Sequence, residues 1–155
     1  MPSLTNKEEV FGAQFVVDAT GEHVRTQERL LATSTEMGLE EAVAGVHSRG
    51  GMVIPAHVDR PSFSLLANLG FVPESLQVEA LEVTRQFIPT AGLERWPQLK
   101  SWCLILDGDA HRLREMENRT LFKIAAPRLE EIHLALKGEQ GRRVVVEWPE
   151  PSQIS

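Results

Sequence analysis

The sequence predicts an α/β fold with a mostly parallel sheet and an N-terminal β-hairpin. Short apolar runs of strand length alternate with segments whose apolar residues recur at helical spacing, a pattern that favours right-handed crossovers between parallel strands. A glycine-containing turn between two strand-like segments predicts the hairpin. The 155 residues suit one domain, 10–148, between tails at 1–9 and 149–155. A closed eightfold β/α barrel needs more chain, roughly 250 residues.

The hairpin is predicted at residues 14–27. Its strands are expected at 14–18 and 23–27, on either side of a turn in which Gly21 supplies a positive φ. A helix is predicted from Leu39, because apolar residues follow at the third, fourth and seventh positions and two glutamates occupy the first turn. Gly50 ends that helix.

The rest of the chain continues the alternation of helices and strands. Continuous apolar runs such as 52–56 are typical of strands that are buried on both faces. Further strands are predicted at 78–83, 102–106, 120–124 and 144–146, and helices at 62–69, 93–99 and from Pro127 to Gly138.

Composition and charge narrow the partners and the compartment. With 16 basic and 22 acidic residues, the net charge of -6 disfavours general binding to nucleic acids or anionic lipids. No apolar stretch approaches the roughly 18 residues needed to span a bilayer, and the N-terminus lacks a signal-peptide pattern. Cys103, the single cysteine, lies in an apolar run and is expected to be a buried, unreactive thiol. Together these features predict a cytoplasmic protein.

Two polar clusters follow predicted strands, at 55–61 and at 107–111. Ligands of α/β folds bind beyond the carboxyl ends of the strands. In an extended segment, Asp109 and His111 point to the same side and present a carboxylate and an imidazole, which suit Zn, Mn or Fe. His57, from the other cluster, would join them. These three side chains are the candidate metal ligands.

Other interpretations of these residues stay open. Asp109 would equally suit the N-cap of a following helix, and His57 a hydrogen-bonded place in the core. Arg60 has the planar guanidinium that matches phosphate or carboxylate, but it would also suit an exposed surface. Structural roles are expected for His23, His47 and His133. The sequence contains no phosphate-cradling glycine loop, dinucleotide fingerprint or serine nucleophile elbow.

Two stretches of the chain resemble the PHP (polymerase and histidinol phosphatase) family of metal-dependent phosphoesterases. The first runs from Gly50 to Leu66 (GGMVIPAHVDRPSFSLL) and continues through Leu69–Pro73 (LGFVP) and Ala80–Arg85 (ALEVTR). The second, Asp109–Leu113 (DAHRL), looks like the terminal Asp-x-His metal motif of that family. The resemblance covers about Val10 to Arg143.

The resemblance implies a fold, a chemistry and residue roles. Family members fold as a distorted β/α barrel with two or three divalent metals at its C-terminal mouth, where a bridging hydroxide attacks a phosphate ester. By matching motifs, His57 would be the ligand of the Ala-His motif. Asp109 and His111 would be the final ligand pair, and Arg60 would contact the substrate phosphate.

Several family features are missing from this chain. No two histidines lie two residues apart, so the first His-x-His motif is absent, as are the next His ligands and the bridging Glu. Asp107-Gly108 replaces the usual Ser-Ser before the Asp-x-His motif and adds a negative charge. The resemblance therefore implies a partial barrel without its N-terminal strands.

The function expected from this resemblance is that of a PHP-like, metal-binding protein. It would hold a single ion weakly or none, and phosphoesterase activity on a small phosphate ester would require another chain or the missing strands. No catalytic residue is assigned. The alternatives are a noncatalytic PHP-derived scaffold or interaction module, and a fragment of a longer phosphoesterase. An incomplete barrel exposes sheet edges, so a homo-oligomer or a partner subunit is expected.

Overall fold

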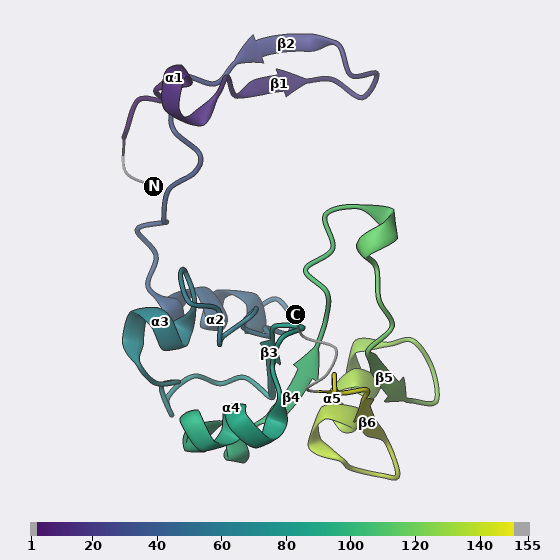
Figure 1. Cartoon of the computed structure of the whole chain (residues 1–155). Coiled ribbons are helices and arrows are strands. Elements are labelled where there is room, and N and C mark those ends of the chain that lie inside the picture. The colour runs from purple at the N-terminus through teal and green to yellow at the C-terminus, as the bar shows by residue number, and fades with distance from the viewer. Residues whose placement is uncertain (1–2, 151–155) are drawn as a thin grey trace. The chain divides into compact units, whose positions relative to one another are not determined.

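The structure is a computed structural model that describes residues 3–150 (Figure 1). It divides between Ala42 and Val43 into two compact units, here called the N-terminal unit and the C-terminal unit. Of the predicted tail at 149–155, residues 151–155 lie outside the described part. Within residues 3–150, no helix is both long and apolar enough to cross a membrane.

The N-terminal unit contains the predicted hairpin, which is confirmed. Strands β1 (Phe15–Val17) and β2 (His23–Thr26) pair antiparallel. Gly21 in the turn has a φ of 89°, a conformation that glycine adopts without steric cost. Asp18 also fixes the turn, since its Oδ1 accepts hydrogen bonds from the Thr20 amide at 2.8 Å and the Thr20 hydroxyl at 2.7 Å.

The predicted N-terminal tail is partly built into this unit. The Asn6 amide donates to the Glu28 carbonyl at 2.7 Å, and the Leu30 amide donates to the Leu4 carbonyl at 2.8 Å. The short helix α1 (Glu8–Phe11) then leads to β1. Leu30 is the one buried side chain among residues 3–42. Backbone hydrogen bonds therefore hold this unit with very little buried apolar surface.

The C-terminal unit contains helices, two 3₁₀ segments and two strand pairs. The helix predicted from Leu39 begins there and spans the boundary between the units. The elements in chain order are α2 (Leu39–His47), α3 (Leu65–Leu69), β3 (Ala80–Val83), α4 (Pro89–Arg95), η1 (Pro97–Ser101), β4 (Cys103–Leu106), η2 (Leu113–Glu115), β5 (Thr120–Lys123), α5 (Leu129–Lys137) and β6 (Arg143–Val146).

The strand pairs confirm a mixed α/β class. β3 and β4 are parallel, in a register that runs from Ala80 opposite Cys103 to Val83 opposite Leu106. β5 and β6 are antiparallel. Of the three strand pairs in residues 3–150, one is parallel and two are antiparallel, so the sheet is less parallel than the sequence predicts. The described strands close no barrel.

The strand predicted at 52–56 is not a regular strand, and this prediction was wrong. The segment reaches β3 through two hydrogen bonds: the Glu82 amide donates to the Pro55 carbonyl at 3.0 Å, and the Val58 amide donates to the Glu82 carbonyl at 2.9 Å. In a regular parallel ladder, the two residues that bond to Glu82 would be separated by one residue, whereas Pro55 and Val58 are separated by two. Proline has no N–H to donate, which interrupts the ladder at this point.

Two predicted helices have different boundaries in the structure. The helix predicted at 62–69 begins only at Leu65, as α3. Ser64 is its N-cap and accepts a hydrogen bond from the Ala67 amide at 3.1 Å. The helix predicted at 93–99 is replaced by α4 followed by η1. Pro97 begins η1, and the ring of a proline at this point does not permit α4 to continue.

The core of the C-terminal unit joins both strand pairs and α5. Ala80, Ile105 and Leu136 form a buried cluster. The partly buried residues that pack against this cluster are Met52, Ile54, Cys103, Phe122, Ile132 and Val144. The segment at 52–56 thus contributes to the core as expected, although it does not form a strand. Burial raises the pKa of the half-buried Cys103 thiol, which keeps it protonated.

Candidate functional site

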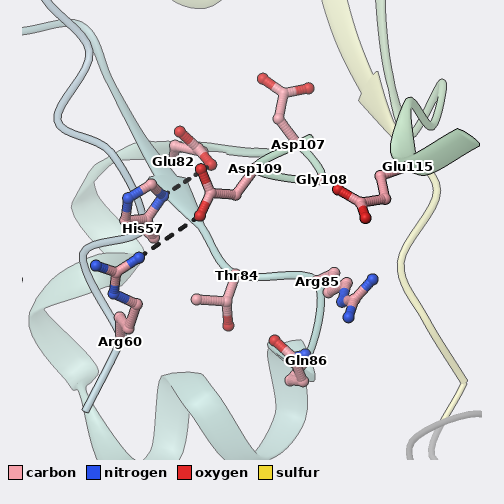
Figure 2. Close-up of a pocket in the computed structure, with 10 residues that line it drawn as sticks. All are labelled: His57, Arg60, Glu82, Thr84, Arg85, Gln86, Asp107, Gly108, Asp109 and Glu115. Carbon is pink, nitrogen blue, oxygen red and sulfur yellow. Dashed lines mark hydrogen bonds and ion pairs between the residues drawn. The ribbon is translucent and has the colours of Figure 1, made fainter. Parts of the chain in front are cut away.

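A polar pocket lies where β3 and β4 end (Figure 2). Its volume is about 340 Å³. Every residue in its lining is polar, charged or glycine: His57, Arg60, Glu82, Thr84, Arg85, Gln86, Asp107, Gly108, Asp109 and Glu115. It occupies the position at which α/β folds bind ligands, beyond the carboxyl ends of parallel strands.

The parallel register of β3 and β4 places the acidic residues of the pocket. Glu82 is the third residue of β3, and Asp107 follows directly after β4. The end of β4 is held by Thr120, whose hydroxyl donates to the Leu106 carbonyl at 2.7 Å and accepts from the Leu106 amide at 2.9 Å. The position of Asp107 therefore depends on the contact between β4 and the first residue of β5.

Asp59 links two segments of the pocket: the loop that contains His57, and the end of β3. Its carboxylate accepts two hydrogen bonds from Thr84, one from the amide at 2.7 Å and one from the hydroxyl at 2.8 Å. Hydrogen bonds to a charged acceptor are stronger than those between neutral groups. Asp59 thus positions two parts of the pocket wall. The sequence does not single out this role, because the partners lie 25 residues apart.

His57 and Glu82 form the more buried pair in the pocket. The distance from His57 Nδ1 to Glu82 Oε1 is 3.4 Å. Burial raises the pKa of the Glu82 carboxyl, and the negative charges of Asp107 and Asp109 act in the same direction, while the bond to His57 opposes them. Glu82 therefore keeps its proton to a higher pH than an exposed glutamate does.

Arg60 and Asp109 form a second, more exposed pair. Arg60 Nη1 lies 3.5 Å from Asp109 Oδ2, and the two side chains are 40% and 46% exposed. Figure 2 marks both pairs with dashed lines. His57 and Asp109 also share an unusual backbone, with φ values of 32° and 48°. A non-glycine residue with positive φ is uncommon and occurs often at functional sites.

His111 lies next to Asp109 but is not part of the pocket lining. Its Nδ1 is 2.7 Å from the Asp109 carbonyl oxygen and 3.9 Å from Asp109 Oδ1, and its side chain is 77% exposed. The sequence-based expectation assumed an extended segment, whereas the left-handed backbone at Asp109 turns the chain. Asp109 does not cap the following helix either, since η2 has no side-chain cap.

Three further acidic residues of the pocket, Glu82, Asp107 and Glu115, were not predicted as site residues. Glu82 lies within the segment 80–85, and Asp107 directly follows the predicted strand at 102–106. Burial raises the pKa of the Asp107 carboxyl. In Figure 2 its carboxylate points away from His57. For Glu82 and Asp107 the available signal was position, because both lie at or near the ends of predicted strands.

The donor types of the pocket suit a divalent cation, but the side chains do not converge on one. An imidazole together with carboxylates is a ligand set for Zn, Mn or Fe. Within residues 3–150, no three His, Cys, Asp or Glu side chains form a group that could hold a metal ion. Glu82 and Asp109 are instead paired with His57 and Arg60. A cation would therefore replace existing partners of these carboxylates.

The formal charge of the pocket is negative. Four carboxylates and two guanidinium groups line it, which gives -2 when His57 is neutral. Negative charges gathered in a cleft attract cations and repel anions. A phosphate would meet favourable electrostatics here only after a cation had entered.

Comparison with known proteins finds no relative of this chain. No family model, curated protein or solved structure matches it. The pocket and the two motifs that contribute to it are thus the features from which a function can be inferred.

Proposed function

We propose that this chain is a PHP-like protein with a partial β/α barrel, whose pocket binds a divalent cation, Zn, Mn or Fe, together with a phosphate ester. One observation carries the proposal. His57 and Asp109, which come from two separate motifs, line the same pocket at the ends of parallel strands, and Arg60 lines it beside them. A cytoplasmic setting belongs to the same proposal.

In this proposal the pocket residues divide into cation ligands and a phosphate contact. His57 and Asp109 hold the cation, and Glu82 supplies a further carboxylate next to them. His111 joins by turning from the Asp109 carbonyl, its present partner, toward the pocket. The Arg60 guanidinium binds the phosphate through paired N–H groups. When bound, a cation of this kind polarises a phosphoryl oxygen and lowers the pKa of water.

The ligand set favours one cation rather than two. Two-metal hydrolysis places the ions about 3.5–4 Å apart, and each needs several protein ligands. The three motif residues and Glu82 would hold at most one ion, weakly, and only after leaving their present partners. We therefore propose that this chain alone binds cation and phosphate ester, and that hydrolysis requires ligands from another chain or from additional strands.

Metal content and thermal stability test this proposal. Protein purified without chelator is expected to contain about one Zn, Mn or Fe per chain, or to gain stability when Mn²⁺ is added, because a ligand that binds only the folded state stabilises it. Asp109→Ala should abolish the gain. Asp18→Ala, which removes a carboxylate from the N-terminal hairpin, should leave it intact. A metal-free preparation that does not respond to Mn²⁺ would refute the proposal.

A noncatalytic interaction module is the second candidate, and the N-terminal unit favours it. The unit exposes many large apolar side chains, namely Leu4, Val10, Phe11, Phe15, Val17, Val24, Leu31 and Met37. Interaction sites are typically rich in exposed apolar side chains. In this reading the chain forms a homo-oligomer through the hairpin. Light scattering should then show a dimer or larger assembly that Phe15→Ser weakens, and a monomer at all concentrations would exclude it.

A further inference from the structure

The outer edge of β1 is an open edge of the N-terminal sheet. Among residues 3–150, β2 is the only strand that pairs with β1 (Figure 1). Gln14 bonds toward β2, since the Gln27 amide donates to its carbonyl at 2.7 Å, and the Asp18 amide donates to the opposite arm of the hairpin at 3.0 Å. Bonding alternates between the two edges of a strand, so Phe15 and Val17 direct their N–H and C=O groups outward.

This edge lacks the features that usually prevent strand pairing. Proteins commonly protect an edge strand with charged side chains, proline or a covering segment. β1 has the sequence Phe-Val-Val, and Phe15 and Val17 are 64% and 53% exposed. On the other side of the sheet, β2 contains a histidine and an arginine, and residues 28–30 bond to residues 4–6. Of the two edges, that of β1 is therefore the one that suits another strand.

We propose that β1 pairs antiparallel with β1 of a second copy of this chain, in a register that places Val16 opposite Val16 of the other copy. This inference rests on the second candidate function, the interaction module, and adds the strand, the register and the partner. It does not depend on the pocket at the ends of β3 and β4. The product is a sheet with the strand order β2-β1-β1-β2 across the two copies.

The outward backbone groups of β1 are self-complementary in this register. With Val16 on the twofold axis, Phe15 of each copy lies opposite Val17 of the other. In an antiparallel pair, opposite residues of this kind exchange both of their N–H···O bonds. The two Phe15–Val17 pairs therefore satisfy every outward N–H and C=O group of the two strands. A twofold interface between identical chains requires such self-complementarity.

The side chains and charges fit the same register. Phe15 of one copy and Val17 of the other lie on one face as an aromatic and β-branched pair, a combination that stabilises paired strands. Asp18 lies opposite Gln14, an uncharged residue, so no like charges meet. A parallel arrangement in register would place the two Asp18 carboxylates side by side, which is unfavourable. The charge pattern therefore favours the antiparallel pair.

The pairing supplies what the N-terminal unit lacks. Leu30 is the one buried side chain among residues 3–42. An isolated two-stranded hairpin is marginally stable, whereas three or more strands with an apolar face can be stable in water. Because residues 4–6 cover part of the far edge, the assembly closes at two copies and does not add further chains.

Sedimentation velocity of the full chain over a range of concentrations measures the pairing. The wild type should form a dimer. Val17→Pro removes an outward N–H from each copy and no bond within the hairpin, so the dissociation constant should rise about tenfold or more. Thr26→Pro is the matched control, because it removes an outward N–H from the far edge of β2 and should leave the dimer intact. Hydrogen exchange at the Asp18 and Gln27 amides, which bond across the hairpin, checks that the hairpin persists in each variant.

A cysteine at position 16 tests the register without a change in the backbone. The Val16 residues of the two copies form a non-hydrogen-bonded pair, with Cα atoms about 4.5 Å apart, which is within the range of a disulfide. Val16→Cys should therefore form a covalent dimer on mild oxidation, detected on a non-reducing gel. Arg25→Cys is the control, since Arg25 lies opposite Val16 in β2, one strand further from the axis, and should form none. Both variants retain the half-buried Cys103.

The outcomes separate this pairing from the function on which it rests. A wild type that stays monomeric at all concentrations would overturn both. A dimer that Val17→Pro and Thr26→Pro affect equally, or one in which Val16→Cys forms no crosslink, would overturn the pairing of β1 while the interaction module stands. If Val17→Pro disrupts the hairpin itself, the crosslink decides.

Discussion

Each of the two units of this chain is stabilised by its own kind of interaction. In the N-terminal unit, residues 3–42, hydrogen bonds join the hairpin and the chain before it, and Leu30 alone is buried. In the C-terminal unit, β3 and β4 carry fully buried side chains, Leu81, Val83 and Leu106, and Leu99 just before β4 is fully buried as well. An isolated two-stranded hairpin is marginally stable in water. Most of the folding free energy therefore lies in the C-terminal unit.

Two aspartates show how this difference affects similar hydrogen bonds. Asp18 accepts from the amide and the hydroxyl of Thr20, two residues away, in an exposed turn. Asp59 accepts from the amide and the hydroxyl of Thr84, which is 25 residues away and partly buried. Asp18 shapes a local turn, whereas Asp59 joins distant segments. The same bonding pattern thus has local consequences in one unit and tertiary consequences in the other.

The largest expected effect is that of removing a core side chain from the C-terminal unit. Leu81 in β3 is 0% exposed. Leu81→Ala should lower the free energy of unfolding by about 2–5 kcal/mol, through lost burial and the cavity left behind. Urea unfolding followed by circular dichroism measures this change. Leu31→Ala, at a leucine of the N-terminal unit that is 52% exposed, serves as the control and should change stability by less than about 0.5 kcal/mol. Equal losses in both variants would contradict the comparison.

Leu30→Ala removes the single buried side chain of the described N-terminal unit and should have a smaller, local effect. The expected loss is near the lower end for a buried leucine, about 2 kcal/mol, because no other side chain among residues 3–42 is buried with it. Hydrogen exchange should become faster at the amides of Asn6 and Leu30, which bond across the unit. Exchange in β3 and β4 should not change. Faster exchange in those strands would show that the two units unfold together.

Asp59→Ala should be more damaging than Asp18→Ala. The Asp59 variant loses two hydrogen bonds to a charged acceptor and leaves the Thr84 amide unsatisfied, which should lower stability by about 2 kcal/mol. It should also lower Mn²⁺ affinity, because the loop that carries His57 loses its contact with β3. Asp18→Ala should disturb the hairpin turn alone. Thermal unfolding of both variants measures the difference, and an Asp18 variant with the larger loss would reverse the comparison.

Local signals in the sequence predicted the hairpin, the first helix and the core segments correctly. The turn with Gly21 and the apolar spacing from Leu39 depend on neighbouring residues, so both could be recognised from sequence. The parallel pairing of β3 with β4 follows from the helix between them. Local signals did not show that 52–56 forms no regular strand. Its apolar character is correct for a core segment, whereas its pairing depends on the position of Pro55 relative to β3.

The pocket was also predictable only in part, because some of its features depend on contacts between distant segments. His57, Arg60 and Asp109 were placed by the rule that ligands bind beyond strand ends, and all three line the pocket. The position of His111 depends on a positive φ at Asp109, which residue spacing does not reveal. The pairing of Glu82 with His57 depends on the β3 register and on the loop between residues 55 and 58. Those are contacts between distant segments, and a single sequence does not encode them in a readable pattern.

The smallest expected effect concerns how stability depends on pH. The contributions of Asp18 and Glu82 to the free energy of unfolding should change in opposite directions as the pH rises. Hydrogen bonds from Thr20 lower the pKa of Asp18 below 3.8, so the hairpin keeps its full contribution above that pH and loses it as the pH falls through the lowered value. Burial raises the pKa of Glu82 above 4.5, so the folded state binds more protons than the unfolded state in that range. The free energy of unfolding therefore falls as the pH rises from 4.5 through the raised value.

Glu82→Gln and Asp18→Asn separate these two contributions. Glu82→Gln removes the buried charge, so it should gain stability relative to the wild type at about pH 7 and match the wild type at about pH 4. Asp18→Asn should weaken the hairpin at about pH 7, and the difference should vanish well below pH 3.8, where the wild-type carboxyl is protonated. Thermal unfolding measures the first difference, and hydrogen exchange in the hairpin measures the second. A Glu82→Gln variant that is less stable than the wild type at neutral pH would contradict this prediction. It would mean that the contact with His57 stabilises the charged carboxylate more than burial destabilises it.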